Sequence, residues 1–575
     1  MDRLRAVLRH ILEPVGLLPA ARVFRRLIFG LIRPGCRRQE IMRRHRERAH
    51  RERFTQFKRQ HGDVLRLNLN RIDKKGQRVL VVGAVRLLEI ELGLIKALEL
   101  AGFEPVVLIL GNSPLLKQYY NLTGVKEFHF WRDYIPSSRF FPAAKAVVEQ
   151  RRSLEELLTF EYVGARVGRI AASTTLRLLR LGSLDLTLDG VRQAVAQQVA
   201  LGMASAIAAQ NVLRRVQPKL ALSIDTGYTG KGELFDNCLA NSVDVIRWHP
   251  AHKSNTLMLK RYTLENRYDH PHSLSSQSWR LVRDMEWTDA RREQLQGELY
   301  ISYASGDWYG ENGTQFNKRL MDTSEIRERL GLDPGKKTAF VFPHIFWDAS
   351  FSWGDSPFDN YEQWFIKTVQ AACANERVNW IIKIHPAHAS NSGEDGLHGE
   401  PVEVVALRKH IGELPPHIFL IPADSDICTY SLFELMDYCL TVRGTVGIEA
   451  AIRGIPVLTA GTGRYDHKGF TIDSETREEY LGRIARIQDI QKLSPAQREL
   501  AERYAYGLFI LRPLPLTTMT LEFDGNNDPD NYFSRTRFQI KTKEEWHTAS
   551  DLGAFAEWVT HSRDEDFMDI SCREK

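Results

Sequence analysis

Continuous apolar runs alternate with amphipathic helical segments in two separate stretches of the chain. In the first stretch, residues 78–84 and 105–110 have the apolar character of buried strands, and residues 87–102 between them have helical periodicity. This strand–helix–strand order predicts parallel strands joined by a crossover helix. A helical region over about residues 143–216 and strands at residues 219–225 and 243–248 are predicted to follow.

A second α/β series begins near Lys336. Its predicted strands lie at residues 338–345, 378–386, 417–422, 438–442 and 455–460, with a helix over residues 360–374. The region between the two series, about residues 255–335, is aromatic-rich with weak periodicity, so an irregular middle segment is expected. The predicted fold class is α/β with two Rossmann-like parallel-sheet domains, whose ligands bind at the carboxyl ends of the strands.

The chain of 575 residues is too long for a single hydrophobic core. We predict four parts, which are a basic amphipathic arm (1–60), an N-terminal Rossmann-like domain with a helical insertion (61–330), a C-terminal Rossmann-like domain (331–520) and a C-terminal tail (521–575). The net charge of +6 is unevenly distributed, because residues 1–60 carry 17 Lys and Arg against 5 Asp and Glu. A strongly basic arm is therefore attached to a mildly acidic body.

The arm contains two amphipathic stretches, over residues 4–12 and 23–32, in which arginines flank apolar positions at helical spacing. This pattern favours a helix in the headgroup layer of an anionic membrane, with residues 1–55 as the contact segment. Packing on the body or on a partner is the alternative. Few aromatic residues lie between the arginines, so binding of nucleic acid is disfavoured.

The six cysteines are scattered without CxxC spacing, which disfavours a disulfide framework or a zinc site and favours a reducing cytoplasm. No apolar run approaches the roughly 18–20 residues that span a bilayer. A signal peptide is not expected either, because the N-terminus lacks an uninterrupted apolar core with a small-residue cleavage site.

The segment from Thr441 to Phe470 is the strongest candidate for a binding site. It is predicted to form a strand end, a glycine-punctuated turn, a short helix, a second strand and a glycine-rich loop. Gly444 and Gly447 allow close approach of the backbone to a ligand, and free N–H groups at the helix start suit a nucleotide phosphate. Thr445 is a further phosphate contact or a helix cap, and Glu449, expected in the first turn, suits ribose hydroxyls.

Basic side chains surround this predicted turn. Arg443 precedes Gly444 and is expected to clamp a phosphate or a sugar carboxylate, or to pair with a structural carboxylate. Arg464 and Lys468 lie in the glycine-rich loop and can contact either the phosphates or the sugar. At the end of a predicted strand, Lys383 and His385 lie on one face, where His385 can donate to a phosphate oxygen.

Other polar residues follow strand ends. His344 and Asp348 come after the first strand of the second half and are candidate cleft residues, with a structural turn as the alternative. Asp225 ends a first-half strand before two glycines, so it is either a general base or a turn former. Asp424-Ser425-Asp426 resembles a metal-binding DxD but is predicted to cap a helix. The pair His249 and His252 is predicted to be structural.

Together these segments resemble the capsule polysaccharide biosynthesis family of bacterial glycosyltransferases. The resemblance covers about residues 336–485 and rests on residues 342–350, 381–388, 426–471 and, less clearly, 223–228. It implies a GT-B fold and catalysis without a bound metal or other cofactor. It also implies that His385, Thr445 and Glu449 contact the nucleotide, supported by Lys383 and Arg443. Relatives that use CMP-linked acidic sugars carry an acidic pair before a glycine, whereas Asp225-Thr226-Gly227 has one acid here.

The resemblance implies sugar transfer from a nucleotide-activated donor to a lipid-linked or polymeric surface glycan. The first half would bind the acceptor, with Asp225 as base, and the second half would bind the donor. The expected location is the inner face of the cytoplasmic membrane, as a peripheral protein. A nucleotide-sugar epimerase or hydrolase of the same fold, and a non-catalytic assembly protein, are the alternatives. The sugar, the nucleotide, the acceptor and the stereochemistry stay open.

Overall fold

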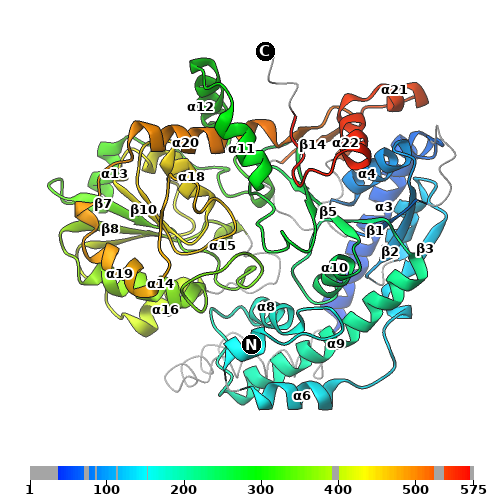
Figure 1. Ribbon diagram of the computed structural model, residues 1–575, viewed down its shortest axis with the longest axis horizontal. Helices are drawn as coiled ribbons and strands as arrows, with labels where there is room; N and C mark the ends of the chain where they lie inside the picture. The colour runs from blue at the N-terminus through cyan, green and yellow to red at the C-terminus, as the bar shows by residue number, and fades with distance from the viewer. Residues whose placement is uncertain are drawn as a thin grey trace.

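The computed structural model describes residues 36–69, 77–84, 87–111, 114–151, 153–390, 400–523 and 536–569. Within these residues it is a mixed α/β structure with two large sheets, which lie side by side in Figure 1. The predicted fold class of two parallel-sheet halves is confirmed. Of the predicted arm, residues 1–35 lie outside the described residues, and the basic segment after them forms the helix α3 (Cys36–Leu65).

The first sheet has seven strands in the order β13-β6-β5-β4-β1-β2-β3. The strands are β1 (Arg78–Val82), β2 (Glu104–Ile109), β3 (Glu127–Phe130), β4 (Leu220–Ser223), β5 (Asp244–Pro250), β6 (Thr256–Tyr262) and β13 (Leu514–Pro515). Neighbours from β5 to β3 pair in parallel, whereas β6 and β13 extend one edge antiparallel. The apolar runs that predicted β1, β2, β4 and β5 are buried because helices cover both faces.

Besides α3, several helices of this first half lie between β1 and β5. They are α4 (Leu88–Leu100), α5 (Pro114–Asn121), α6 (Phe141–Gln150), α7 (Leu154–Leu158), α8 (Val167–Leu179), α9 (Asp189–Val216) and α10 (Lys231–Ala240). The predicted helical region of residues 143–216 is thus four helices. Two of these, α8 and α9, pack on each other and form a core that also takes in Trp347 and Phe351 from the second half.

The second sheet has six strands in the order β12-β11-β10-β7-β8-β9, and every neighbouring pair is parallel. Its strands are β7 (Lys337–Val341), β8 (Val378–Lys383), β9 (Ile418–Ile421), β10 (Tyr438–Thr441), β11 (Val457–Thr459) and β12 (Ile472–Asp473). Its helices are α14 (Tyr361–Cys373), α15 (Ala387–Ser390), α16 (Val402–His410), α17 (Thr429–Leu432), α18 (Thr445–Ala451), α19 (Arg477–Ala485) and α20 (Pro495–Tyr506). Five of these strands match the sequence prediction.

The middle segment of residues 255–335 contains more regular structure than expected, with irregular stretches between its elements. It contains β6 and the helices α11 (Ser276–Asp284), α12 (Asp289–Ala304) and α13 (Thr323–Leu330). Lys260 and Arg261 interrupt the apolar run of β6, yet both are buried and pair with carboxylates elsewhere in the fold. A search for apolar runs does not identify strands that contain buried charged residues.

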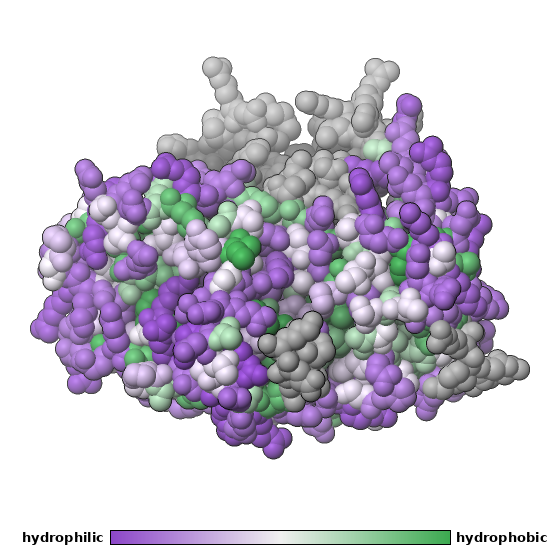
Figure 2. Space-filling view, turned by 90° about the horizontal axis from the view of Figure 1, so that it is seen from above, coloured by the Kyte–Doolittle hydropathy of each residue, from purple (hydrophilic) through white to green (hydrophobic). Residues whose placement is uncertain are grey.

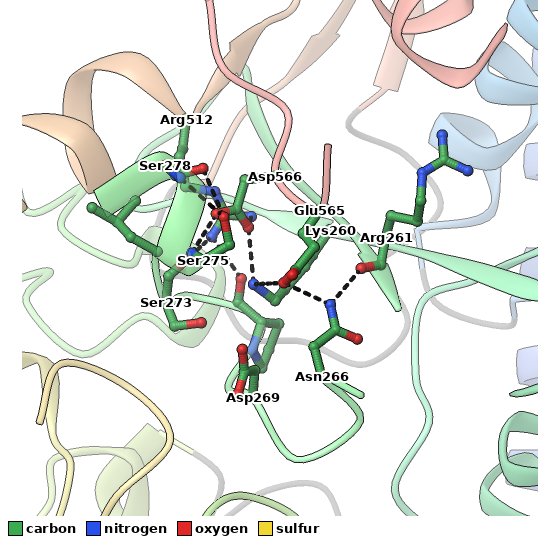
Figure 3. A network of polar contacts seen from close by, with 12 residues as sticks. Lys260, Arg261, Asn266, Asp269, Ser273, Ser275, Ser278, Arg512, Glu565 and Asp566 are labelled. Carbon is green, nitrogen blue, oxygen red and sulfur yellow. Dashed lines mark hydrogen bonds and ion pairs between the residues drawn. The ribbon is translucent and has the colours of Figure 1, made fainter. Parts of the chain in front are cut away.

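After α20 the chain returns to the first half. It adds β13 to the first sheet and then forms β14 (Met519–Leu521), β15 (Thr536–Phe538), α21 (Lys543–Thr548) and α22 (Ser550–His561). Figure 1 shows α22 beside α4, far from the second sheet. Beyond α22, the buried carboxylate of Asp566 pairs with Lys260 of β6 and with Arg512 (Figure 3). The four-part division of the chain stays a prediction.

The surface is mainly hydrophilic on the face shown in Figure 2, with small scattered hydrophobic areas. In the part of the chain that the structure describes, no helix combines the length and the apolar character needed to cross a membrane.

Candidate functional site

The glycine-punctuated turn after β10 is held by hydrogen bonds from neighbouring side chains. Gly444 is the N-cap of α18, and its N–H donates to Thr441 Oγ1 at 3.1 Å. The Tyr465 hydroxyl donates to the Gly444 carbonyl at 2.7 Å. A Cβ on Gly447 would lie 2.2 Å from the Tyr465 oxygen, so the glycine is needed for this packing. The sequence suggested close approach of a ligand instead.

Arg464 connects the turn to two other loops. Its guanidinium donates to Thr445 Oγ1 at 2.8 Å and to the carbonyls of Arg443 and His272, at 3.0 and 3.2 Å. Within the described residues it forms no ion pair, although its side chain is buried. Arg464 therefore brings an unneutralised positive charge to the first turn of α18, where the helix N-terminus is positive as well.

Arg443 is also buried, and its guanidinium donates to the carbonyls of Trp353 and Asp355. Both predicted uses, a clamp on a ligand and a salt bridge, assign it a carboxylate or phosphate partner, but within the described residues its guanidinium bonds to backbone carbonyls. Its own N–H donates to His344 Nε2 at 3.2 Å. Arg443 thus fixes the loop after β7 against the turn after β10.

His344 stacks on Tyr361 with ring centroids 4.6 Å apart. Burial, with the nearby Arg443, His385 and Arg464, holds the pKa of His344 well below its ordinary value. The ring is therefore neutral, and its Nε2 is free to accept the Arg443 N–H. Val341 of β7 pairs with Ile382 of β8, so the two predicted histidines follow neighbouring strand ends.

His385 is a neutral hydrogen-bond donor. Its Nδ1 accepts the N–H of Ala387 at 3.2 Å, so the proton lies on Nε2. Burial, with His388 and Lys383, lowers the pKa of His385 to about 3. Among the described residues no acceptor is matched to its Nε2–H, which is the donor that a phosphate oxygen would need.

Lys383 ends β8 with only 6% of its surface exposed. No carboxylate of the described residues lies within ion-pair distance of its ammonium group. Burial, together with Lys318, lowers the pKa of Lys383 to about 8, so the group is still mainly protonated at pH 7. Burial of an ammonium group without a carboxylate partner carries a large desolvation free energy, which a bound anion would offset.

Glu449 is the fifth residue of α18 and not part of its first turn, which corrects the sequence prediction. Its buried carboxyl accepts a hydrogen bond from the Tyr303 hydroxyl of α12. Burial raises the pKa of Glu449 to about 7, although Tyr303 and Arg453 act in the opposite direction. Lys468, by contrast, is half-buried and makes no hydrogen bond or ion pair within the described residues.

Asp225 follows β4 at the carboxyl edge of the first sheet. Its Oδ1 accepts the Gly227 N–H at 3.1 Å, and its Oδ2 lies 3.5 Å from Lys231 Nζ. Burial alone would raise the pKa of Asp225, but Lys231, Arg247 and the Gly227 N–H hold it below its ordinary value. The carboxylate is thus ionised at neutral pH and also shapes the turn, so both predicted roles are compatible with the structure.

Asp348 joins the two halves next to Asp225. Its Oδ1 accepts hydrogen bonds from Arg177 of α8 at 2.8 Å and from Tyr228 at 2.6 Å. A Cβ on Gly227 would lie 3.4 Å from Ser352 Oγ. The loop that carries Asp225 therefore contacts the loop that follows β7.

Two further sequence predictions concern acidic and histidine pairs. Asp426 pairs with Arg329 at 2.7 Å, and the N-cap of α17 is Cys428, so the predicted capping by the Asp424–Asp426 pair is wrong. His252 is buried against Glu298 at 2.6 Å, as expected of a structural residue. His249 lies 3.5 Å from Glu311 and packs on His272.

Residues 317–501 match the family described as capsule polysaccharide biosynthesis protein, which confirms the family resemblance for this part of the chain. No curated protein matches the chain.

Similar solved structures include two from Thermosulfurimonas dismutans, described as KpsC beta Kdo 2,4 and beta Kdo 2,7 transferases. The first is 12% identical and covers 51% of this chain and 80% of its own, with a TM-score of 0.30. The second is 17% identical and covers 52% and 79%, with a TM-score of 0.28. A UDP complex of MnaA from S. aureus is 12% identical and covers 75% and 94%, with a TM-score of 0.30. These scores are too low to support a function.

Proposed function

We propose that this protein transfers a sugar from a nucleotide-activated donor to a capsule or other surface glycan or glycolipid. The family match over residues 317–501 supports the chemistry. One structural feature supports the site, which is that two loops contact the loop after β7. The loop of Asp225 approaches Ser352 through Gly227, and the turn at Thr445 contacts Trp353 through Arg443. Arg464 adds positive charge at Thr445. A base and a phosphate site would then share one cleft.

On the donor side, the leaving nucleotide phosphate gains negative charge as the glycosidic bond to it breaks. Arg464 and Lys383 bring positive charge to this edge of the second sheet, and His385 offers a neutral N–H donor. Preorganised donors of this kind lower the barrier because they need no reorganisation during the reaction. In this proposal the chain's own cations offset the phosphate charge, and no metal is required.

On the acceptor side, Asp225 accepts the proton of the attacking hydroxyl while the new bond to the anomeric carbon forms. Its lowered pKa keeps it ionised at neutral pH, as a proton acceptor must be. The Gly227 N–H and Lys231 orient the carboxylate.

The test begins with thermal shifts of the full chain against CMP, UDP, GDP and TDP, followed by turnover of the corresponding sugar with a glycan acceptor. Asp225→Asn is expected to keep the nucleotide-induced shift and to lose about 100-fold or more in turnover. The matched control is Asp133→Asn, at a carboxylate that is 60% exposed. Wild-type turnover of Asp225→Asn would contradict its role as base. Turnover without any acceptor would point to the epimerase or hydrolase class.

Membrane association through the arm is part of the same proposal. Phe57 of α3 packs on Tyr119 and Phe538, so the end of this helix is anchored on the body. Deletion of residues 1–47 leaves that anchor in place and removes most of the basic residues. We expect the truncated chain to stay folded and to lose sedimentation with phosphatidylglycerol vesicles. Unchanged sedimentation would exclude residues 1–47 as the contact.

A further inference from the structure

A cleft between the two halves is lined by arginines that no sequence motif indicated. Arg166 and Arg169 at the start of α8 and Arg267 of the loop after β6 line it. Gly227 and the loop of Ser352 and Trp353 line it as well. The cleft therefore opens directly beside the loop of Asp225.

The arginines are crowded around a single aromatic ring. The guanidinium carbons of Arg166, Arg169 and Arg267 lie 4.6, 5.3 and 5.0 Å from the ring centroid of Tyr268. Arg166 is neutralised by Asp236 at 2.6 Å. Arg169 and Arg267 form no ion pair within the described residues.

The hydrogen bonds of these two arginines are long and go to neutral acceptors. Arg169 donates to the Phe351 carbonyl at 3.4 Å, and Arg267 donates to the Tyr268 hydroxyl at 3.3 Å. Each guanidinium has five N–H donors, so most remain available to a ligand. Two positive charges that line one cleft without a carboxylate favour an anion there.

The position of Arg169 strengthens this argument. It lies in the first turn of α8, which contains no acidic residue. A helix N-terminus carries partial positive charge, so a cation there is unfavourable and an anion is favourable. The backbone of the helix and the two side chains thus act in the same direction.

We propose that Arg169 and Arg267 bind an anionic group of the acceptor, a carboxylate or a phosphate, in this cleft. The assignment to the acceptor rests on the proposed function, because the cleft lies beside Asp225 on the first-half side. Planar guanidinium groups bind both kinds of anion in bidentate fashion. The loop of Arg267 is held by the hydrogen bond from the Gly354 N–H to the Tyr268 carbonyl, at 2.9 Å.

The test is calorimetric titration of the full chain with inorganic phosphate, with D-glucuronate and with neutral D-glucose. The variants are Arg169→Gln, Arg267→Gln and the double variant. Arg214→Gln is the matched control, since Arg214 of α9 is exposed and, among the described residues, bonds only to Asn211 and Gln210. We expect at least one anion to bind the wild type, at least tenfold more weakly in each single variant and unchanged in the control.

The anion that binds shows which anionic group of the acceptor the cleft recognises. Binding of phosphate alone supports a phosphate-linked acceptor, and binding of glucuronate supports an acidic glycan. No binding of either anion, equal binding of glucose, or unchanged binding in the double variant would overturn the proposal. Nucleotide-induced thermal shifts of the same variants are expected to be unchanged, which separates this site from the donor site. Calorimetry measures anion binding without any turnover. The result therefore stays interpretable even if the protein proves not to transfer a sugar.

Discussion

The ionisation of His385 shows how one residue combines a functional and an energetic role. Burial, with His388 and Lys383 nearby, lowers the pKa of His385 to about 3, so it stays neutral in the folded protein. The unfolded chain has an ordinary histidine pKa near 6.5 and binds the proton first as the pH falls. Stability linked to His385 is therefore present above pH 6.5 and is lost progressively between pH 6.5 and 3.

His385→Gln removes this proton linkage. We expect its free energy of unfolding to fall about 2 kcal/mol less than that of the wild type between pH 7 and pH 5. Urea denaturation at both pH values measures the difference. His561→Gln on α22 is the control, because His561 is 66% exposed. If both variants follow the wild-type pH dependence, His385 is not buried as a neutral group.

At the scale of elements, the short helix α18 depends on a contact that its own sequence does not reveal. Gly447 leaves room for the Tyr465 hydroxyl, which in turn bonds to the Gly444 carbonyl. A methyl group at residue 447 would lie 2.2 Å from that oxygen, a distance that no side chain tolerates without a shift.

Gly447→Ala is expected to destabilise the protein by about 1–3 kcal/mol, because the added methyl group overpacks this site. Gly482→Ala in α19 is the control, since no atom lies within 4 Å of its added Cβ. The control should be stabilised by about 0.5–1 kcal/mol through helix propensity. Thermal and urea denaturation compare the two. Equal stabilities would mean that Tyr465 yields easily and that the glycine is not needed for packing.

The same scale explains the main error in the predicted fold. Apolar periodicity identifies strands whose side chains are mainly apolar, such as β1, β8 and β10. In β6 the buried Lys260 and Arg261 obtain their partners from residues 566 and 244, which are distant in sequence. The local sequence pattern does not indicate such distant partners, so residues 255–335 were predicted to be irregular.

For the molecule as a whole, the C-terminal segment stabilises the first half through a buried ion-pair network at Asp566. Asp566 is fully buried and bonds to Lys260 at 2.9 Å, to Arg512 at 3.2 Å and to the Ser275 N–H at 2.7 Å (Figure 3). Burial disfavours its charge, but Arg512 and Lys260 outweigh that effect and lower the pKa of Asp566 to about 2. The network links β6, the start of α11 and the chain before β13 to the last described residues.

Asp566→Ala leaves Lys260 and Arg512 buried without their carboxylate. We expect a loss of about 3–5 kcal/mol in the free energy of unfolding, as for other broken buried ion pairs. The control is Asp564→Ala, whose exposed carboxylate bonds only to Gln277 in the part of the chain that the structure describes and should contribute less than about 1 kcal/mol. Urea denaturation of both variants gives the comparison. A loss below 1 kcal/mol for Asp566→Ala would show that solvent replaces the carboxylate.

The sequence by itself determined the two α/β halves, five of the six strands of the second sheet, and the residue types at the strand ends. These follow from apolar periodicity and from the family segments, both of which are local. Asp225, His385 and Lys383 were predicted at or near strand ends in this way, because a polar residue that follows a buried apolar run is recognisable in the sequence.

Only the tertiary structure decided what each polar group contacts. In the folded chain Arg443 donates to backbone carbonyls, and Glu449 accepts a hydrogen bond from Tyr303. Gly447 packs against the Tyr465 hydroxyl. Arg169 and Arg267 lie around the ring of Tyr268. The physical reason is that hydrogen bonds and ion pairs join residues far apart in the chain. Their partners are set when the two sheets pack, and no single segment encodes them.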